Sequence, residues 1–194
     1  MSLISKLKGL HNDNSISMHV PGHKNNTIGE LSDVIKADYD LTEIPGLDDL
    51  HDPVEILSEL NTMLAQKAPG YHAQAMVNGT TNGIICSIHA IKERVSHFYI
   101  AGDAHKSVYH GVSLINSDYT VIRPEELYEL DLDDSCVILT SPSYTGELIK
   151  DIEKHVEYIR KNNGLSIIDA AHGAHLSITN NFEASLLKSG ADVV

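Results

Sequence analysis

The feature that most constrains the fold is a regular alternation of short apolar runs with helix-like segments in the second part of the chain. The strand-like runs cover residues 73–77, 98–101, 120–122, 137–140 and 165–168. The helix-like segments cover residues 80–94, 105–114 and 149–161. Strands that alternate with helices predict an α/β fold, with a mainly parallel sheet covered by helices on both faces.

The region before this alternation is less regular. Leu3, Leu7 and Leu10 predict a short opening helix, and a loop punctuated by proline and glycine follows at residues 17–26. A second loop-like segment covers residues 41–53. A helix is expected from Pro53, with Asp52 as its N-cap, to an end near Pro69 and Gly70.

Composition excludes some classes of function. The 194 residues carry a net charge of -13, which would repel a phosphate backbone and argues against nucleic-acid binding. Cys86 and Cys136 both lie in apolar runs without paired spacing, which predicts buried thiols rather than a disulfide. We find no stretch typical of a signal peptide or a membrane span, so we expect a soluble, cytoplasmic protein without a membrane partner.

Residues 78–81, Asn-Gly-Thr-Thr, lie between an expected strand and an expected helix. Backbone N–H groups and two hydroxyls would face an anion such as a phosphate at the positive end of the helix dipole. The alternative is a glycine turn followed by a threonine N-cap. The spacings of the nucleotide P-loop and of the Rossmann motif are both absent.

Asp169 follows the apolar run 165–168, which predicts a carboxylate at the end of a central strand. A buried carboxylate needs a partner, and a protonated pyridine nitrogen is a suitable one because the ion pair keeps the ring an electron sink. Asp169 could instead cap the turn at residues 170–172. His105, at the start of an expected helix, offers either a flat face for an aromatic ring or a cap.

A metal site is a further hypothesis, because Asp169, His172 and His175 could gather three ligands around one turn. Gly173 and the loop context do not fix both imidazoles on one face, and no general-base glutamate lies nearby. We therefore assign no metal ligand.

Five motifs in order resemble the Orn/Lys/Arg decarboxylases, which are pyridoxal-phosphate-dependent enzymes of aminotransferase-like fold type I. The motifs cover residues 21–24, 42–50, 78–81, 105–108 and 169–175. The chain has no room for the N-terminal wing domain of the large members, so it is more similar to the short bacterial forms. The resemblance implies residues 1–52 as an N-terminal helix and loop segment, and residues 53–194 as an incomplete cofactor-binding large domain.

The resemblance also implies a set of contacts with pyridoxal 5'-phosphate. These are the phosphate at Thr80 and Thr81, the ring face at His105, the ring nitrogen at Asp169, the pocket wall at Ala171 and His172, and the phenolic edge near the segment from Ser141 to Tyr144. Asp169 and His105 would be the catalytic residues. Ala170 stands where many relatives have glutamate, and Thr81 where many have serine.

In the family, a serine-x-histidine-lysine motif supplies the lysine that forms the internal aldimine. That lysine is absent from this sequence, and Lys24 and Lys106 belong to other motifs. We therefore expect an inactive N-terminal fragment of a homo-oligomeric enzyme that decarboxylates ornithine, lysine or arginine, in polyamine metabolism. The alternatives are a non-catalytic remnant that acts as a binding protein and, third, a metal-dependent hydrolase that uses Asp169, His172 and His175.

Overall fold

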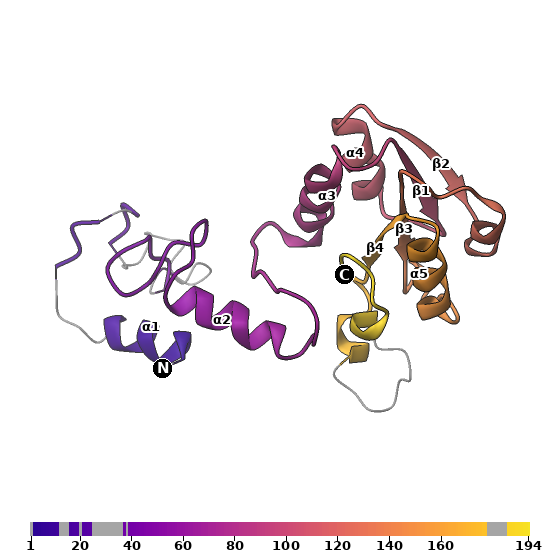
Figure 1. The fold of residues 1–194 in the computed structure, drawn as a ribbon. Coiled ribbons are helices and arrows are strands. Elements are labelled where there is room, and N and C mark those ends of the chain that lie inside the picture. Colours follow the sequence, from indigo (N-terminus) through magenta and orange to yellow (C-terminus); the bar gives the residue numbers. More distant parts are fainter. Residues whose placement is uncertain (1, 12–15, 20, 25–36, 38, 178–185) are drawn as a thin grey trace. The chain divides into compact units, whose positions relative to one another are not determined.

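The computed structural model describes residues 2–11, 16–19, 21–24, 37, 39–177 and 186–194, and the predicted loop at 17–26 lies partly outside these residues. The chain forms two compact units, residues 1–75 and residues 76–194 (Figure 1). The domain boundary expected after residue 52 stays a prediction. Among the described residues, no helix is long and apolar enough to span a membrane.

The N-terminal unit contains α1 (Leu3–His11) and α2 (Ile56–Ala65), which contact each other. The helix expected from Pro53 therefore begins later and ends earlier than predicted. Asp52 was wrong as its N-cap, because Glu55 occupies the N-cap position and provides no side-chain cap.

The start of α2 is held by Asp48, a residue outside the helix. Its carboxylate accepts hydrogen bonds from the backbone N–H groups of Asp49 (3.0 Å), Val54 (2.9 Å), Glu55 (2.8 Å) and Leu57 (3.0 Å). Partial burial raises the pKa of Asp48. The four hydrogen bonds lower it by more than burial raises it, so the pKa falls to about 2. Asp48 adopts a left-handed backbone conformation, with φ of 76°, which aspartate tolerates better than most residues.

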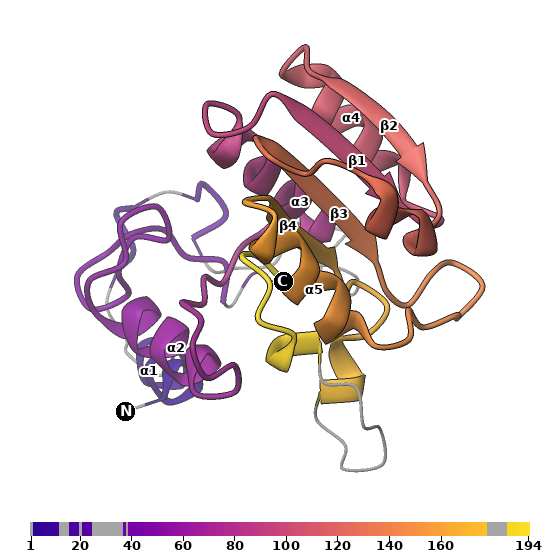
Figure 2. The same cartoon turned by 45° about the vertical axis from the view of Figure 1, so that its right-hand side comes forward.

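The C-terminal unit is built on a four-stranded parallel sheet in the order β2-β1-β3-β4 (Figure 2). Its strands are β1 (His97–Ala101), β2 (Asp118–Ile122), β3 (Ser135–Thr140) and β4 (Leu165–Asp169). β3 is buried along its whole length, as its continuous apolar run predicts for a strand covered on both faces. The prediction of a parallel sheet is confirmed.

Helices cover both faces of this sheet, as the alternation predicted (Figure 1). On one face, α3 (Gly79–Ile91) and α4 (Lys106–Leu114) pack over a cluster that includes Phe98 and Ile138. On the other face, α5 (Ile152–Lys161) and η2 (Pro124–Glu129) pack over Leu139 and Ile168. Neighbouring residues of β3 thus serve opposite cores, because side chains alternate along a strand.

The remaining short elements are η3 (Ala174–Ser177) and η4 (Leu186–Lys188). Beyond them, Val193 forms an isolated parallel bridge with Ile167 of β4. The Asp192 carboxylate accepts hydrogen bonds from the backbone N–H (2.8 Å) and the hydroxyl (2.9 Å) of Ser166. These contacts attach residues 192–193 to the outer edge of β4.

Three further predictions need correction. Residues 73–77 form no strand, and the backbone N–H of Ala75 instead donates to the side chain of Asn61 (2.8 Å). β4 lies at the end of the strand order rather than in its centre. Cys136 is buried as expected, but Cys86 is exposed, because its position on α3 does not face the sheet.

Candidate functional site

A small cavity of about 130 Å³ lies where the carboxyl ends of three strands meet the start of α3. Thr140 ends β3 and Asp169 ends β4, and the two residues are paired in the register of the sheet. His105 follows β1 at the start of α4. The cavity is lined by Thr80, Thr81, His105, Ser107, Thr140, Tyr144, Asp169, Ala171 and His172. Carboxyl ends of parallel strands are the usual place for a ligand in such sheets.

The start of α3 borders this cavity and has no side-chain cap among the described residues. Asn78 is the N-cap in a left-handed conformation, with φ of 69°, and makes no side-chain cap bond. Gly79 follows with φ of 70°, a conformation that glycine adopts without strain. The threonine N-cap that the sequence left open is therefore not what the structure shows. Thr80 and Thr81, in the first turn, line the cavity where the helix dipole favours an anion.

His105 combines a cap with a flat ring face. Its Nδ1 accepts hydrogen bonds from the backbone N–H (3.2 Å) and the hydroxyl (2.8 Å) of Ser107, so it caps α4. Because Nδ1 is an acceptor, the proton of the neutral ring lies on Nε2. The interpretation of His105 as a cap is therefore confirmed, and its role as a ring face for a ligand stays a prediction.

Tyr144 lies against two histidines at the cavity. Its ring stacks on His105, with ring centroids 5.8 Å apart and an interplanar angle of 24°. It also meets His172 edge-on, at 5.2 Å and 63°. The cavity therefore offers an aromatic wall that a flat ring can contact.

Asp169 is 4% exposed and lines the same cavity. Its Oδ1 accepts a hydrogen bond from the backbone N–H of Ala171 (3.1 Å). Asp169 therefore caps the following turn, which is one of the two roles that the sequence analysis offered for it. Within the residues that the structure describes, no hydrogen bond reaches Oδ2 of Asp169, so this oxygen can receive a donor from a ligand. Burial makes such a partner valuable, because an unpaired buried charge is costly.

Thr140 gives an independent sign that the cavity receives a ligand. Its side chain is 4% exposed, and its hydroxyl oxygen Oγ1 is buried without a hydrogen-bond partner among the described residues. Buried polar groups in native proteins almost always have a partner. The residues present therefore fit a polar ligand at this position.

The structure brings together six of the seven predicted cofactor-binding residues and leaves out one. Thr80, Thr81, His105, Asp169, Ala171 and His172 line the cavity. Ser141 does not, because its buried hydroxyl accepts from the backbone N–H of Ile149 (3.1 Å). His175 also lies outside the cavity lining, and no group of three metal-ligating side chains occurs within the described part of the chain.

Two lining residues, Ser107 and Thr140, were not predicted as site residues, whereas Tyr144 ends the segment 141–144 that was expected near the cofactor. Thr140 carried a signal, because it is the polar residue that ends a continuous apolar run, as Asp169 does. Ser107 lay within the motif at residues 105–108, but nothing in its spacing showed that its side chain faces the cavity.

No family model matches the chain, but a comparison with known proteins finds relatives that match most of its length. The uncharacterized protein YaaO of Bacillus subtilis is 30% identical over 93% of the chain and 42% of its own length. The arginine decarboxylase of the same organism is 25% identical over 92% of the chain and 41% of its own length. A UPF0425 pyridoxal phosphate-dependent protein of Methanosphaera stadtmanae is 25% identical over 60% of the chain and 32% of its own length.

Among solved structures, lysine decarboxylase A from Pseudomonas aeruginosa superposes with a TM-score of 0.70 and 16% identity. The match covers 86% of this chain and 27% of that one, and it shows a shared fold. The chain spans about two fifths of the length of the curated relatives that match most of it.

Proposed function

We propose that this chain, which belongs to the Orn/Lys/Arg decarboxylase-like family, forms the part of a basic amino-acid decarboxylase that binds pyridoxal 5'-phosphate. The observation that carries the proposal is the single cavity that joins a buried carboxylate, a flat imidazole and an open helix N-terminus. These three features complement the pyridine nitrogen, the ring face and the phosphate of this cofactor.

The start of α3 would hold the phosphate. The first N–H groups of a helix lack partners within the helix, and the dipole adds a positive potential at that end. The hydroxyls of Thr80 and Thr81 would donate to phosphate oxygens from the same turn. No lysine or arginine is among the described residues that line the cavity, so we expect the phosphate to depend on these donors.

The buried Asp169 would hold a proton on the pyridine nitrogen. Its position at the end of β4, paired with Thr140 of β3, keeps the carboxylate out of bulk water, and an ion pair is stronger away from water. When bound, the cofactor supplies an electron sink for the electron pair that remains as carbon dioxide leaves the substrate. His105 would cover one ring face, and Ala171 would leave room on the wall beside Asp169.

This chain spans about two fifths of its relatives' length, so the activity of a whole protein is part of the proposal. The names of the relatives support arginine or lysine as the substrate class, and we extend this to ornithine from the family resemblance. A homo-oligomeric, cytoplasmic enzyme is part of the same proposal.

The test uses pyridoxamine 5'-phosphate, which has no aldehyde and does not react with surface lysines. Calorimetric titration of the purified chain should show binding, and pyridoxamine without the phosphate should bind more weakly. Asp169→Asn should weaken binding about 10- to 100-fold, because it removes a charge-assisted hydrogen bond. Asparagine keeps an oxygen that can accept from Ala171, so the turn is retained.

His175→Ala is the matched control, because His175 lies in η3 and outside the cavity lining. It should leave the affinity unchanged. Equal affinities of the wild type and Asp169→Asn, or no binding of the phosphate compound, would contradict the proposal. Equal losses in Asp169→Asn and His175→Ala would point instead to a general disturbance of residues 169–177.

A further inference from the structure

The cavity at the carboxyl ends of the strands is small for the ligand proposed for it. Its volume is about 130 Å³, whereas pockets that bury a small organic ligand usually measure about 300–1,000 Å³. A pyridine ring that carries a phosphate group therefore needs more room than the empty cavity offers. One of the side chains that line the cavity must move when such a ligand enters.

Most residues that line the cavity cannot enlarge it. Asp169 and Thr140 end two paired strands and are each 4% exposed, so the sheet fixes their positions. Thr80 and Thr81 are small and lie in the first turn of α3. The ring of His105 is held by two hydrogen bonds to its Nδ1. Enlargement of the cavity therefore depends on the lining side chains that are both large and exposed.

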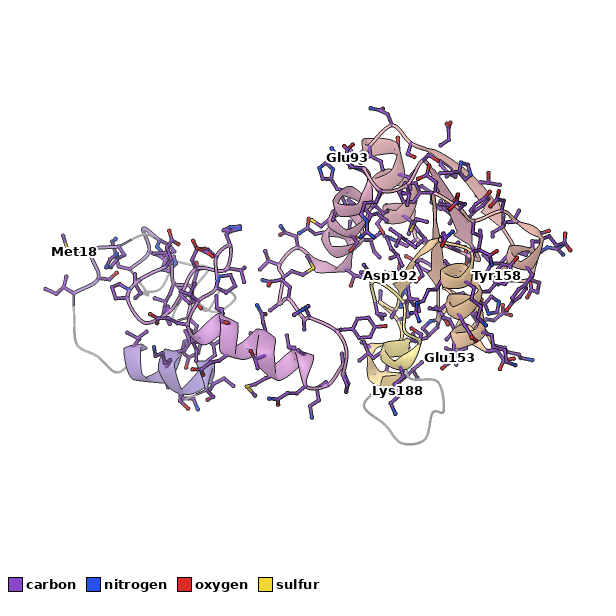
Figure 3. The ribbon with its side chains drawn as sticks, viewed as in Figure 1. Met18, Glu93, Glu153, Tyr158, Lys188 and Asp192 are labelled. Carbon is purple, nitrogen blue, oxygen red and sulfur yellow. The ribbon has the colours of Figure 1, made fainter. Side chains whose placement is uncertain are left out.

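Tyr144 is such a side chain. It is 58% exposed, and its hydroxyl forms no hydrogen bond within the described part of the chain. By contrast, the hydroxyl of Tyr158, labelled on α5 in Figure 3, donates to the carbonyl oxygen of Tyr128 (3.1 Å). His172 is also exposed, but its ring meets Tyr144 edge-on. An exposed side chain held only by ring contacts changes rotamer readily, so the ring of Tyr144 can leave its place.

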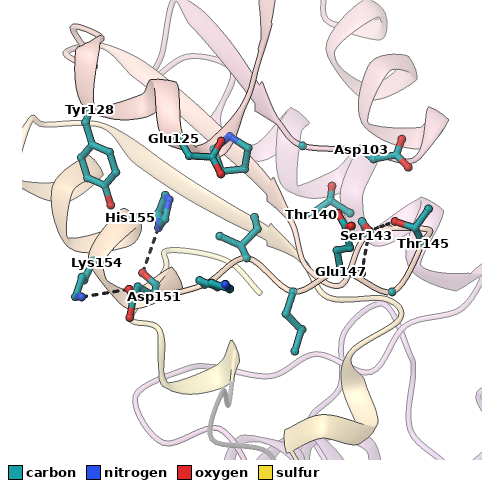
Figure 4. A pocket seen from close by; sticks show the side chains of 16 residues that line it. Asp103, Glu125, Tyr128, Thr140, Ser143, Thr145, Glu147, Asp151, Lys154 and His155 are labelled. Carbon is teal, nitrogen blue, oxygen red and sulfur yellow. Dashed lines mark hydrogen bonds and ion pairs between the residues drawn. The ribbon is translucent and has the colours of Figure 1, made fainter.

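The backbone that carries Tyr144 is fixed without help from its ring. The buried Ser143 donates from its backbone N–H to the carbonyl oxygen of Glu147 (2.9 Å), and its hydroxyl accepts from the backbone N–H of Glu147 (3.2 Å). The same hydroxyl lies 2.9 Å from that of Thr145 (Figure 4). The N–H of Gly146 donates to the carbonyl oxygen of Ser143 (3.0 Å). The turn therefore keeps its shape when the ring of Tyr144 moves.

The ring of Tyr144 lies against the face of His105. The two ring centroids are 5.8 Å apart, and the rings are 24° from parallel. A flat ligand between them would need a contact distance of about 3.5–4.0 Å on each side, which is at least about 7 Å in total. The space between the two rings is too narrow for this. Tyr144 and a flat ligand therefore compete for the same face of His105.

We propose, on the basis of the function proposed above, that Tyr144 occupies the place of the cofactor ring on His105 while the cavity is empty, and moves out when the cofactor enters. Entry then breaks the contact between Tyr144 and His105. A ligand with a flat ring replaces that contact with its own, whereas a ligand without one does not. Tyr144 is thus a specificity-determining residue that favours phosphate compounds with a flat ring.

The first measurement is calorimetric titration of the purified chain with pyridoxamine 5'-phosphate. Tyr144→Ala should bind this compound about two- to tenfold more tightly than the wild type, because no ring contact has to be broken. Tyr144→Phe should bind like the wild type, since it keeps the ring and the hydroxyl forms no hydrogen bond among the described residues. Equal or weaker binding by Tyr144→Ala would make Tyr144 a fixed wall of the cavity and overturn the proposal.

Two controls separate exchange of rings from other effects of the substitution. Inorganic phosphate, which has no ring, should bind the wild type and Tyr144→Ala with equal affinity. A similar gain for phosphate would mean that Tyr144 blocks the start of α3 instead. Tyr119→Ala is the matched variant, because Tyr119 is 44% exposed on β2 and lies outside the cavity lining. A gain of the same size in this variant would reduce the effect to general loosening and overturn the assignment.

A measurement without ligand tests the contact itself. In proton NMR spectra, the ring protons of His105, assigned by comparison with His105→Gln, should shift in Tyr144→Ala and keep their positions in Tyr144→Phe. Unchanged positions in Tyr144→Ala would contradict the stacked arrangement. If pyridoxamine 5'-phosphate binds none of the three chains, the proposed function fails and this inference fails with it. If the compound binds the wild type without a gain in Tyr144→Ala, this inference alone fails.

Discussion

The two units of the chain reach their structures by different means. In residues 1–75, the buried apolar side chains among those described are Ala37, Leu47, Ile56 and Ala68, and two of these are alanines. Asp48 compensates for this small apolar core by accepting four hydrogen bonds from backbone N–H groups. The C-terminal unit instead has two clusters of large apolar side chains, one on each face of its sheet.

This contrast teaches that the units should respond to different perturbations. Burial of apolar area contributes free energy that hardly depends on pH. Hydrogen bonds to an ionised carboxylate depend on its charge, so they weaken when the carboxylate is protonated. The sheet unit should therefore be sensitive to loss of core volume, and the N-terminal unit to acid.

The largest effect is expected from a core substitution in the sheet. Ile138→Ala removes a side chain of β3 that is 0% exposed, and the cavity left behind should cost about 2–5 kcal/mol of unfolding free energy. Urea unfolding measures the loss. Val121→Ala is the control, because Val121 is 54% exposed on β2 and should change stability by less than about 0.5 kcal/mol. Similar losses in both variants would contradict a difference between core and surface here.

Acid should affect the N-terminal unit through Asp48. Its pKa is about 2 in the folded chain, against about 3.9 in an unfolded one, so its support is complete above the unfolded value and is lost as the pH falls through about 2. Hydrogen exchange of the Val54, Glu55 and Leu57 amides, measured from pH 5 to pH 2, should reveal loss of protection over the lower part of this range.

The substitution Asp48→Asn should speed exchange of the same amides at neutral pH, because a neutral side chain is a weaker acceptor than a carboxylate. Asp52→Asn is the matched control: it is the residue that local capping rules select, but it forms no cap in the structure. Faster exchange in Asp52→Asn than in Asp48→Asn would favour Asp52 as the N-cap, as the sequence analysis expected.

The smallest effect compares packing at two glycines. A Cβ at Gly111 of α4 would lie 2.7 Å from Cδ1 of Ile88, so Gly111→Ala should destabilise by about 1–3 kcal/mol, offset by up to about 1 kcal/mol of helix propensity. At Gly9 of α1, nothing lies within 4 Å, and Gly9→Ala should stabilise by up to about 1 kcal/mol. Thermal melting should therefore show shifts of opposite sign, and two stabilising substitutions would show that the α3–α4 contact can relax.

The sequence predicted the elements whose signal is local and continuous. The apolar runs that became β1, β3 and β4, and the helical segments around Ile88 and Val156, were all found with boundaries within a few residues. Parallel pairing followed from their alternation. These elements were predictable because the apolar side chains that pack them into the core lie within the elements themselves.

The failures arose where structure depends on distant residues. Residues 73–77 have strand-like composition, but a strand needs a partner, and here the side chain of Asn61 takes the N–H of Ala75. Asp48 caps α2 from several residues away through a left-handed turn that local capping rules do not consider. Cys86 lies in an apolar run, but its exposure depends on which side of α3 meets the sheet.

The candidate site shows the same division. Thr80, His105 and Asp169 were found because each follows an expected strand in a motif. Ser141 follows a strand too, but its hydroxyl turns to the backbone of Ile149, which only the folded loop reveals. The ring of Tyr144 lies at the cavity against His105 and His172, two histidines that are distant from it in sequence.

The cap formed by His105 limits how this protein could be redesigned. A larger aromatic residue at position 105 would keep or widen the ring face, but it would have no ring nitrogen at the place where Nδ1 accepts from Ser107. The first turn of α4 would then need a new acceptor. An engineer who wants a broader stacking surface should therefore vary Tyr144, which is 58% exposed and accepts no backbone hydrogen bond in the structure described for residues 39–177.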